Sequence, residues 1–324
     1  MIPKFEPAFK KLKVTALAGG VGGAKLLVGL DKVLEPGQLT AIVNTGDDFS
    51  HFGLHISPDL DSVCYALAGL ADPLHGWGRK DETWHVLEEL RAIGAPDWFA
   101  LGDKDLAWHL ERQRLLNAGK TLTEVTSQFC EINGIASHVL PMCDESAPTL
   151  IMTKTGEWLG FQDYFVRQKC EPEIAEIALS ENSRIAASEL VLNTLEEADL
   201  IVFTPSNPWV SIDPILELQG VREILEKKVV VAVSPIVQGN ALKGPAAKMF
   251  RELGISPSAL AVRQHYEDVL DGFIFDDLDI QNAGNWEPSA IISESYQTIM
   301  KDEADKISLA EAVISLGVRI LQDR

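Results

Sequence analysis

A cluster of glycines follows the first apolar run of the chain and is its clearest candidate for chemistry. Val14–Leu17 has the composition of a buried strand, the glycine-rich stretch Gly19–Lys25 follows it, and a helical pattern comes next. Glycines let a phosphate approach the backbone closely, and free N–H groups at a helix N-terminus attract anions. The alternative is a tight turn that uses glycine for geometry alone. The pattern favours a phosphate site made by Gly20, Gly22, Gly23 and Lys25.

The two best-known phosphate motifs are both incomplete here. The Walker pattern requires a Gly-Lys pair where Ala24 stands, and the dinucleotide pattern G-x-G-x-x-G matches Gly20 and Gly22 but has Lys25 in place of its third glycine. A lysine one turn into a helix suits a diphosphate better than a close contact between helix and strand. We therefore expect a diphosphate-binding variant of the βα turn.

Carboxylates gather after the second apolar run, Leu39–Asn44. Asp47 and Asp48 come directly after it, and Asp59 and Asp61 follow within fifteen residues. Such a set would repel itself in one cleft without a cation, and oxygen ligands of this kind suit Mg²⁺, which completes its shell with substrate phosphates and water. Asp59 and Asp61 have an alternative role as helix caps, and Asp47 and Asp48 as a solvated turn. We predict that at least one of the four binds the metal ion.

Two further loops follow apolar runs that read as buried strands. Thr204-Pro205-Ser206-Asn207-Pro208-Trp209 is held by two prolines and offers side-chain donors, and Ser234–Asn240 follows a second run. Each loop taken alone is more typical of an ordinary turn. Because the carboxyl ends of parallel strands share one edge of a sheet, all of these loops are expected around a single crevice. A fourth polar segment, Leu101–His109, combines Asp103, Lys104 and Asp105 and also has an alternative role as a helix start.

Composition limits the class of protein. The chain has 324 residues and a net charge of −20, from 28 basic and 48 acidic residues, which disfavours a nucleic-acid binder. It also requires lysines, backbone amides or a metal to reverse the local field around a phosphorylated ligand. No apolar run is long enough to span a bilayer, and residues 1–13 lack the apolar core of a signal peptide. The four cysteines have neither zinc nor disulfide spacing. We expect a cytoplasmic protein.

The pattern of apolar runs predicts that one α/β domain over residues 1–324 positions these residues. We expect a Rossmann-like fold with a mostly parallel sheet and an inserted helical layer. The insertion or lid is expected at about residues 60–133 and an antiparallel hairpin at about 149–161. Later strands are predicted over Leu200–Thr204, Val229–Val233 and Leu260–Arg263, with a helix over Ile215–Lys227 between the first two.

At these motifs the chain resembles the phospholactate transferase family, whose members act in the biosynthesis of coenzyme F(420). The resemblance covers nearly the whole chain. Beyond the glycine loop it includes Gly46-Asp47-Asp48, Ser57–Asp61, Gly76-Trp77-Gly78, Glu82-Thr83-Trp84, Trp98-Phe99, Leu101-Gly102-Asp103, Pro205–Pro208 and Ser234-Pro235-Ile236. Ala100 departs from the basic residue that members often carry there, and Lys104 stands where they usually have arginine.

The resemblance implies a transferase that joins the phosphoacid of a guanylylated donor to the ribityl hydroxyl of the deazaflavin Fo and releases GMP. It implies small-molecule substrates, a Mg²⁺ ion and a cytoplasmic enzyme that binds neither nucleic acid nor membranes, and a homodimer is expected. The glycines and Lys25 would bind the diphosphate. Asp47 and Asp61 would hold Mg²⁺ or orient the hydroxyl, Ser206, Asn207 and Pro208 would hold the leaving group, and Asp48 and Lys104 would contact ligand.

Two alternatives remain at this point. A related superfamily of regulatory nucleotide-sugar-binding proteins shares the glycine loop and the Asp-Asp turn but continues into a Gly-Gly-Ser-Ser run, where this chain has Phe49-Ser50-His51-Phe52. A nicotinamide dehydrogenase would use Asp47 or Asp48 on the ribose, but it needs the missing third glycine.

Overall fold

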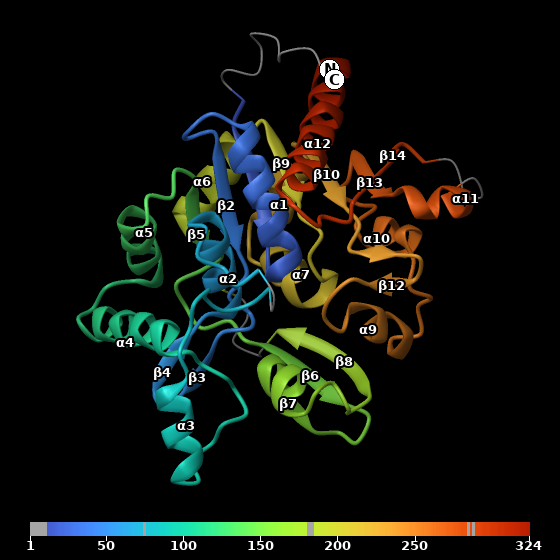
Figure 1. The fold of residues 1–324 in the computed structure, drawn as a ribbon. Coiled ribbons are helices and arrows are strands. Elements are labelled where there is room, and N and C mark those ends of the chain that lie inside the picture. Colours follow the sequence, from blue (N-terminus) through green and yellow to red (C-terminus); the bar gives the residue numbers. More distant parts are fainter. Residues whose placement is uncertain (1–11, 74–75, 180–184, 284–285, 287–288) are drawn as a thin grey trace.

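A sheet of parallel strands forms the centre of the molecule (Figure 1). The computed structural model describes residues 12–73, 76–179, 185–283, 286 and 289–324; most of the segment 1–13 considered above lies outside them. Within these residues seven strands pair in the order β14-β13-β10-β9-β1-β2-β5, and every pairing is parallel. Their bounds are β1 Val14–Ala18, β2 Leu39–Val43, β5 His138–Pro141, β9 Leu200–Phe203, β10 Val229–Val233, β13 Gly272–Asp276 and β14 Ile292–Tyr296.

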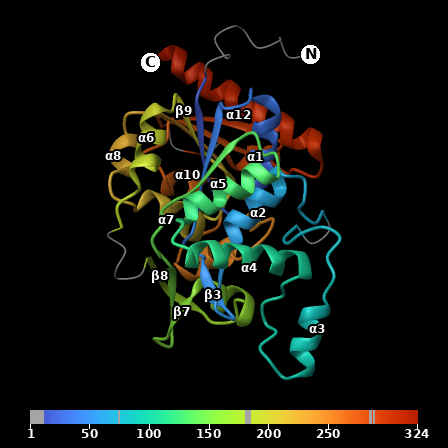
Figure 2. The same ribbon diagram turned by 90° about the vertical axis from the view of Figure 1, so that its left-hand side faces the viewer.

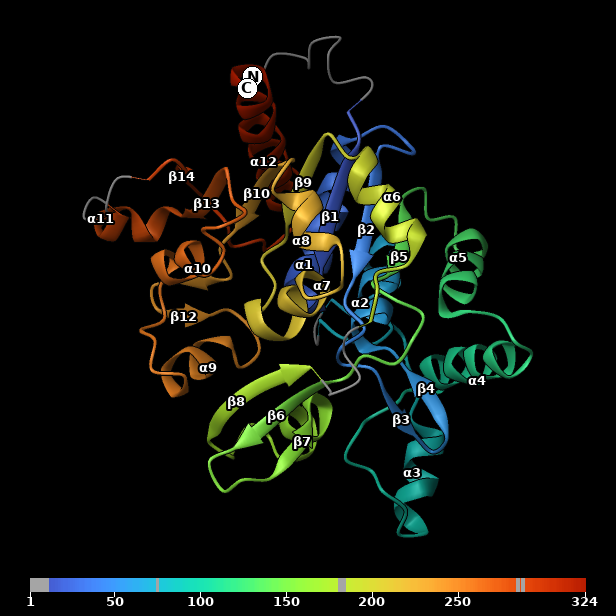
Figure 3. The same ribbon diagram turned by 180° about the vertical axis from the view of Figure 1, so that it is seen from behind.

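Helices cover both faces of this sheet, which accounts for the continuous apolar runs of its strands. Helices α1 (Gly20–Val33), α2 (Pro58–Leu67) and α12 (Glu303–Asp323) lie on the face seen in Figure 1 and share one apolar core with the sheet. The opposite face, seen in Figure 3, carries a second core under α6 (Glu189–Glu197), α7 (Asp213–Leu216), α8 (Val221–Leu225), α9 (Ala246–Glu252) and α10 (Ala259–His265). The predicted Rossmann-like α/β fold is confirmed.

Two predicted elements were wrong in detail. Leu260–Arg263 lies inside helix α10 rather than in a strand, because Ser258 caps the helix by accepting a hydrogen bond from the backbone N–H of Ala261. The helix expected over Ile215–Lys227 is two short helices, α7 and α8. They are separated at Gly220, whose φ of 89° lies in the left-handed region that ends helices.

Smaller elements gather at the carboxyl ends of the parallel strands. The hairpin of β3 (Phe49–His51) and β4 (Leu54–Ile56) leaves the sheet directly after β2. The segment that follows contains α2, α3 (His85–Ala92), α4 (Asp103–Asn117) and α5 (Leu122–Ile132). In Figure 2, α4 and α5 lie across the face of the molecule that is turned toward the viewer. A second sheet, in the order β7-β6-β8, is made by β6 (Thr149–Thr153), β7 (Trp158–Gly160) and β8 (Ile174–Leu179).

The chain reverses direction across the sheet next to β1. After β1 it adds β2 and β5 on one side, and it then returns to add β9, β10, β13 and β14 on the other. Ligands of open α/β sheets bind where the strand order reverses, outside the carboxyl ends of the strands. The glycine loop after β1 and the Ser206 loop after β9 flank this point.

Candidate active site

Helix α1 packs unusually close to the loop that follows β9, and this contact requires glycine. A Cβ atom on Gly22 would lie 2.5 Å from the carbonyl oxygen of Pro205, and one on Gly23 would lie 2.5 Å from Oγ of Ser206. Gly20 has φ +63°, a conformation that side chains disfavour. The glycines thus bring the N-terminus of α1 against the neighbouring strand end, and its first-turn N–H groups lie at the point where the strand order reverses.

The Ser206 loop is fastened to the glycine loop by its own side chains. Ser206 Oγ donates to the carbonyl oxygen of Gly19 at 2.7 Å and accepts from the N–H of Gly19 at 3.1 Å. Asn207 Oδ1 accepts from the N–H of Trp209 at 3.2 Å, which caps the turn that begins at Pro208. In the structure, therefore, the Ser206 side chain holds this loop against the glycine loop and the Asn207 side chain caps the turn that follows it.

Three lysines, Lys25, Lys243 and Lys306, lie close enough together for the charges of Lys243 and Lys306 to act on Lys25. Lys25 Nζ donates to the carbonyl oxygen of Met300 at 2.8 Å. Burial, followed by the charges of Lys243 and Lys306, lowers the pKa of Lys25. Lys243 Nζ lies against Gly76, next to the side chain of Val21 in the first turn of α1. The backbone of Lys306 packs against Gly29, farther along α1, so Lys243 is the lysine that lies beside the first turn of the helix.

Asn44, at the end of β2, joins two buried carboxylates. Its Nδ2 donates to Asp59 Oδ2 at 2.9 Å and lies 3.5 Å from Asp47 Oδ1. Asp59 Oδ1 accepts from the N–H of Gly20 at 2.6 Å, so this residue of α2 caps helix α1. Asp47 Oδ2 accepts from Gln162 at 2.9 Å. One line of polar contacts thus runs from the glycine loop to Asp47.

Burial and mutual repulsion favour protonation of these carboxyl groups. Burial raises the pKa of Asp59 to about 7. Burial, and then the charges of Asp59 and Asp48, raise the pKa of Asp47 well above its usual value. A divalent cation between the two would offset both effects. Across the part of the chain that the structure describes, however, no three His, Cys, Asp or Glu side chains converge as a metal-binding group, so any cation here would rely on substrate oxygens and water.

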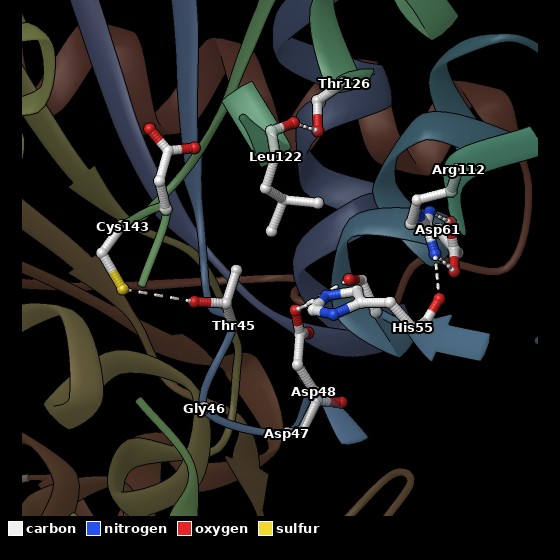
Figure 4. A network of polar contacts seen from close by, with 12 residues as sticks. Thr45, Gly46, Asp47, Asp48, His55, Asp61, Arg112, Leu122, Thr126 and Cys143 are labelled. Atoms are coloured by element: carbon white, nitrogen blue, oxygen red, sulfur yellow. Dashed lines mark hydrogen bonds and ion pairs between the residues drawn. The ribbon is translucent and has the colours of Figure 1, made fainter. Parts of the chain in front are cut away.

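The structure does not bring Asp61 together with Asp47. Asp61 faces α4, where Arg112 holds it in a two-pronged ion pair, Nη1 to Oδ2 at 3.1 Å and Nη2 to Oδ1 (Figure 4). Both residues are buried. Asp48 lies between the two groups: its Oδ2 is 2.9 Å from His55 Nε2 and accepts from Ser57 at 2.7 Å. Its Oδ1 is buried and has no hydrogen-bond partner among the described residues.

A cavity of about 150 Å³ opens on the far side of Asp47, between the β3 hairpin and the β7-β6-β8 sheet. Thr149 Oγ1 is buried there without a hydrogen-bond partner in the described chain, and Gly46 lies directly against it. Its lining combines the aromatic side chains of Phe49, Trp98 and Phe161 with polar groups. The lining residues are Gly46, Asp47, Asp48, Phe49, Trp98, Pro148, Thr149, Gly160, Phe161, Gln162, Asp163 and Arg167.

Helices α3 and α4 cap each other, which explains two of the polar motifs. Asp103 accepts from the N–H groups of His85 and Val86 at the start of α3, and Glu82 accepts from those of Lys104 and Asp105 at the start of α4. The Lys104 side chain is exposed and is not among the residues that line the cavity. The polar side chains of this segment therefore hold the start of α3 against the start of α4.

Sequence reasoning missed Arg112 and Gln162 and treated Asp59 only as a metal ligand or a cap of its own helix. Asn44 stood at a predicted strand end, which is a usable signal. Arg112 lies in an ordinary helical pattern and Gln162 follows a hairpin, and nothing in their spacing indicates a partner 51 or 115 residues away.

The parallel sheet, with a glycine turn opening helix α1 where the strand order reverses, defines a Rossmann-like α/β protein. Residues 14–319 match the family model described as 2-phospho-L-lactate transferase CofD. The chain belongs to this family, and the resemblance seen in its motifs is confirmed. No helix within the described residues is long and apolar enough to cross a membrane.

Similar curated proteins carry two names. A phosphoenolpyruvate transferase of Thermobifida fusca is 36% identical, with 95% of this chain and 99% of the relative covered. A 2-phospho-L-lactate transferase of Methanosarcina acetivorans is 35% identical, covering 93% and 97%. Among solved structures, a member of the UPF0052 family from Bacillus halodurans has a TM-score of 0.58 at 16% identity, covering 94% of this chain and 99% of that one, a likeness of fold alone. These matches do not favour a regulatory nucleotide-sugar-binding protein.

Proposed function

We propose that this protein joins the phosphoacid of a guanylylated donor to the ribityl hydroxyl of the deazaflavin Fo and releases GMP, in the biosynthesis of coenzyme F(420). The names of its relatives support the donor acids, phospholactate or phosphoenolpyruvate. Relatives with either name are 35–36% identical to the chain, so overall identity does not select between the acids. A cytoplasmic location and a homodimer stay predictions.

The observation that carries this proposal is the polar line from Gly20 through Asp59 and Asn44 to Asp47, with the cavity beyond it. The donor diphosphate lies along the first turn of α1, beside Lys25. The acceptor occupies the cavity, where Phe49, Trp98 and Phe161 offer faces and edges to a planar ring. The reacting phosphorus then lies near Asp47, between donor and acceptor.

In the reaction, the ribityl oxygen forms a bond to the phosphorus that carries the acid, and the bond from that phosphorus to the bridging oxygen of GMP breaks. Asp47 accepts the hydroxyl proton, because it lies at the end of the polar line and in the lining of the cavity that holds the acceptor. The N–H groups of α1 and the nearby lysines stabilise charge on the departing GMP. Phosphoryl-type transfer depends mainly on such positioning and charge neutralisation.

The same carboxylates fit a Mg²⁺ ion. Asp47 and Asp59 are buried and share Asn44, and the charges of Asp59 and Asp48 add to burial in raising the pKa of Asp47. The unpartnered Oδ1 of Asp48 belongs to the residue next to Asp47. Mg²⁺ usually takes one or two carboxylates and completes its shell with phosphates and water. When bound it would neutralise charge on the diphosphate. We assign it to Asp47 and Asp59 in place of Asp47 and Asp61, since Arg112 already engages Asp61.

The proposal is tested by incubating the purified protein with Fo, Mg²⁺ and each guanylylated acid in turn, and weighing the product. We expect Fo to gain one phosphoacid and GMP to appear in equal amount, and EDTA to abolish the transfer until Mg²⁺ is restored. Binding of a nucleotide sugar or of NAD, without any transfer to Fo, would contradict the assignment.

A further inference from the structure

The cavity is also lined by a carboxylate and a guanidinium to which the proposed reaction assigns no role. Asp163 and Arg167 lie at the two ends of the short helix η2 (Asp163–Arg167) that follows β7, and both line the cavity. Asp163 Oδ1 is buried and, in the described part of the chain, has no hydrogen-bond partner. Arg167 Nη1 is 3.8 Å from it, too far for a hydrogen bond, and the arginine side chain is 61% exposed.

The lining of the cavity combines three kinds of chemical group. Asp47 and the unpartnered Thr149 hydroxyl suit aliphatic hydroxyls. Phe49, Trp98 and Phe161 supply aromatic walls. At helix η2, a buried carboxylate oxygen of Asp163 without a hydrogen-bond donor lies 3.8 Å from the Arg167 guanidinium, which has several N–H groups. An occupant that satisfies all three has a polyol tail, a flat ring and a ring edge with an N–H next to a carbonyl oxygen.

We infer that Asp163 and Arg167 bind the pyrimidinedione edge of the deazaflavin acceptor, an inference that rests on the function proposed above. Asp163 Oδ1 accepts from the ring N–H, and Arg167 donates to the adjacent carbonyl oxygen. Both are hydrogen bonds to charged groups, the stronger kind in proteins. The pair selects acceptors by this edge and takes no part in the transfer itself.

Binding of Fo without donor, measured by calorimetry, tests this pair. We expect Arg167→Met and Asp163→Leu each to weaken Fo binding about tenfold or more, the usual loss for a hydrogen bond to a charged group. Affinity for GDP and the melting temperature should not change. Lys154→Met is the matched control, because Lys154 lies in the turn directly after β6, forms an exposed ion pair with Glu173 and does not line the cavity.

A chemically altered acceptor separates direct recognition from a general effect on the cavity. Fo methylated at the ring N–H should bind the unaltered protein as weakly as Fo binds Asp163→Leu, and Asp163→Leu should no longer distinguish the two ligands. Equal binding of both ligands to the unaltered protein would overturn the inference. So would a loss in Arg167→Met that affects only the donor, since Arg167 would then serve the donor carboxylate.

The same samples separate this inference from the proposed function. Transfer to Fo by the unaltered protein, with unchanged Fo affinity in both variants, overturns the role of Asp163 and Arg167 alone. Absence of transfer with every acid refutes the function, and absence of Fo binding refutes both.

Discussion

Asp61 and Asp47 should respond to the same substitution in opposite ways. Asp61 and Arg112 form a buried two-pronged ion pair, with 7% and 3% of each residue exposed. Asp61→Asn removes the negative charge and leaves the Arg112 guanidinium buried without full compensation. Breaking one side of such a pair typically costs about 3–5 kcal/mol. We expect the melting temperature to fall on the order of 10 °C, while the protein that remains folded turns over at a near-normal rate.

Asp47→Asn should stabilise the metal-free protein and abolish turnover. Burial and the charges of Asp59 and Asp48 disfavour ionised Asp47 in the folded state. Removing the charge should therefore increase the free energy of unfolding. Asparagine is close in size and keeps an oxygen that can accept from Gln162. It cannot take the proton of the attacking hydroxyl, and we expect turnover to fall by about two to four orders of magnitude.

The assay pairs a melting curve with turnover per folded molecule, for both variants and for the double variant Asp61→Leu/Arg112→Met. The double variant is the control, because replacing both partners of a buried ion pair by apolar groups is often neutral or stabilising. We expect it to recover most of the stability lost in Asp61→Asn. A protein with Asp61→Asn that melts normally but is inactive would refute this reasoning and return Asp61 to the reacting centre.

Three further outcomes are expected. Burial raises the pKa of Asp59 to about 7 from 3.8, so protonated Asp59 stabilises the fold fully below about pH 4, and this contribution, on the order of a few kcal/mol, is lost as the pH rises to 7. The metal-free protein should therefore have a lower melting temperature at pH 8 than at pH 6, and Asp59→Asn should reduce this difference in melting temperature. Mg²⁺ should raise the melting temperature more at pH 8 than at pH 6. An unchanged pH difference in Asp59→Asn would contradict the role of Asp59. Gly22→Ala should lower the melting temperature without any ligand, because its Cβ would meet the Pro205 carbonyl at 2.5 Å. Lys25→Met should weaken GDP binding about tenfold with little change in melting, and unaltered GDP affinity would remove Lys25 from the diphosphate site.

The general position of the site could be predicted from the sequence because it depends on local signals. A glycine turn between a strand and a helix, and polar residues at the end of β2, are contained in short stretches such as Gly19–Lys25 and Asn44–Asp48. Parallel strands bring their carboxyl ends to one edge of a sheet whatever their order. These two facts together predict the neighbourhood of the glycine loop and the Ser206 loop, which are in contact in the structure.

The partners of individual side chains could not be predicted in this way. Asp59 and Asp61 are two residues apart on α2 and therefore point in different directions, one to the glycine loop and the other to α4. Which of them faces Asp47 depends on how α2 is rotated against the sheet and on where the insertion presents Arg112. Packing of distant elements decides both, and neither spacing nor composition of the short motif contains that information.

The net charge of −20 is compatible with an anionic donor because electrostatics act locally. At physiological salt, exposed charges are largely screened beyond about 8 Å. Distant surface carboxylates therefore matter less at the first turn of α1 than Lys25 and Lys243, whose charges act on each other there. The first turn of α1 adds its dipole on the same side. The acidic residues nearest the crevice, Asp47 and Asp59, are buried and favour protonation until a cation joins them, so the field that a donor meets there is set by a few groups rather than by the composition of the chain.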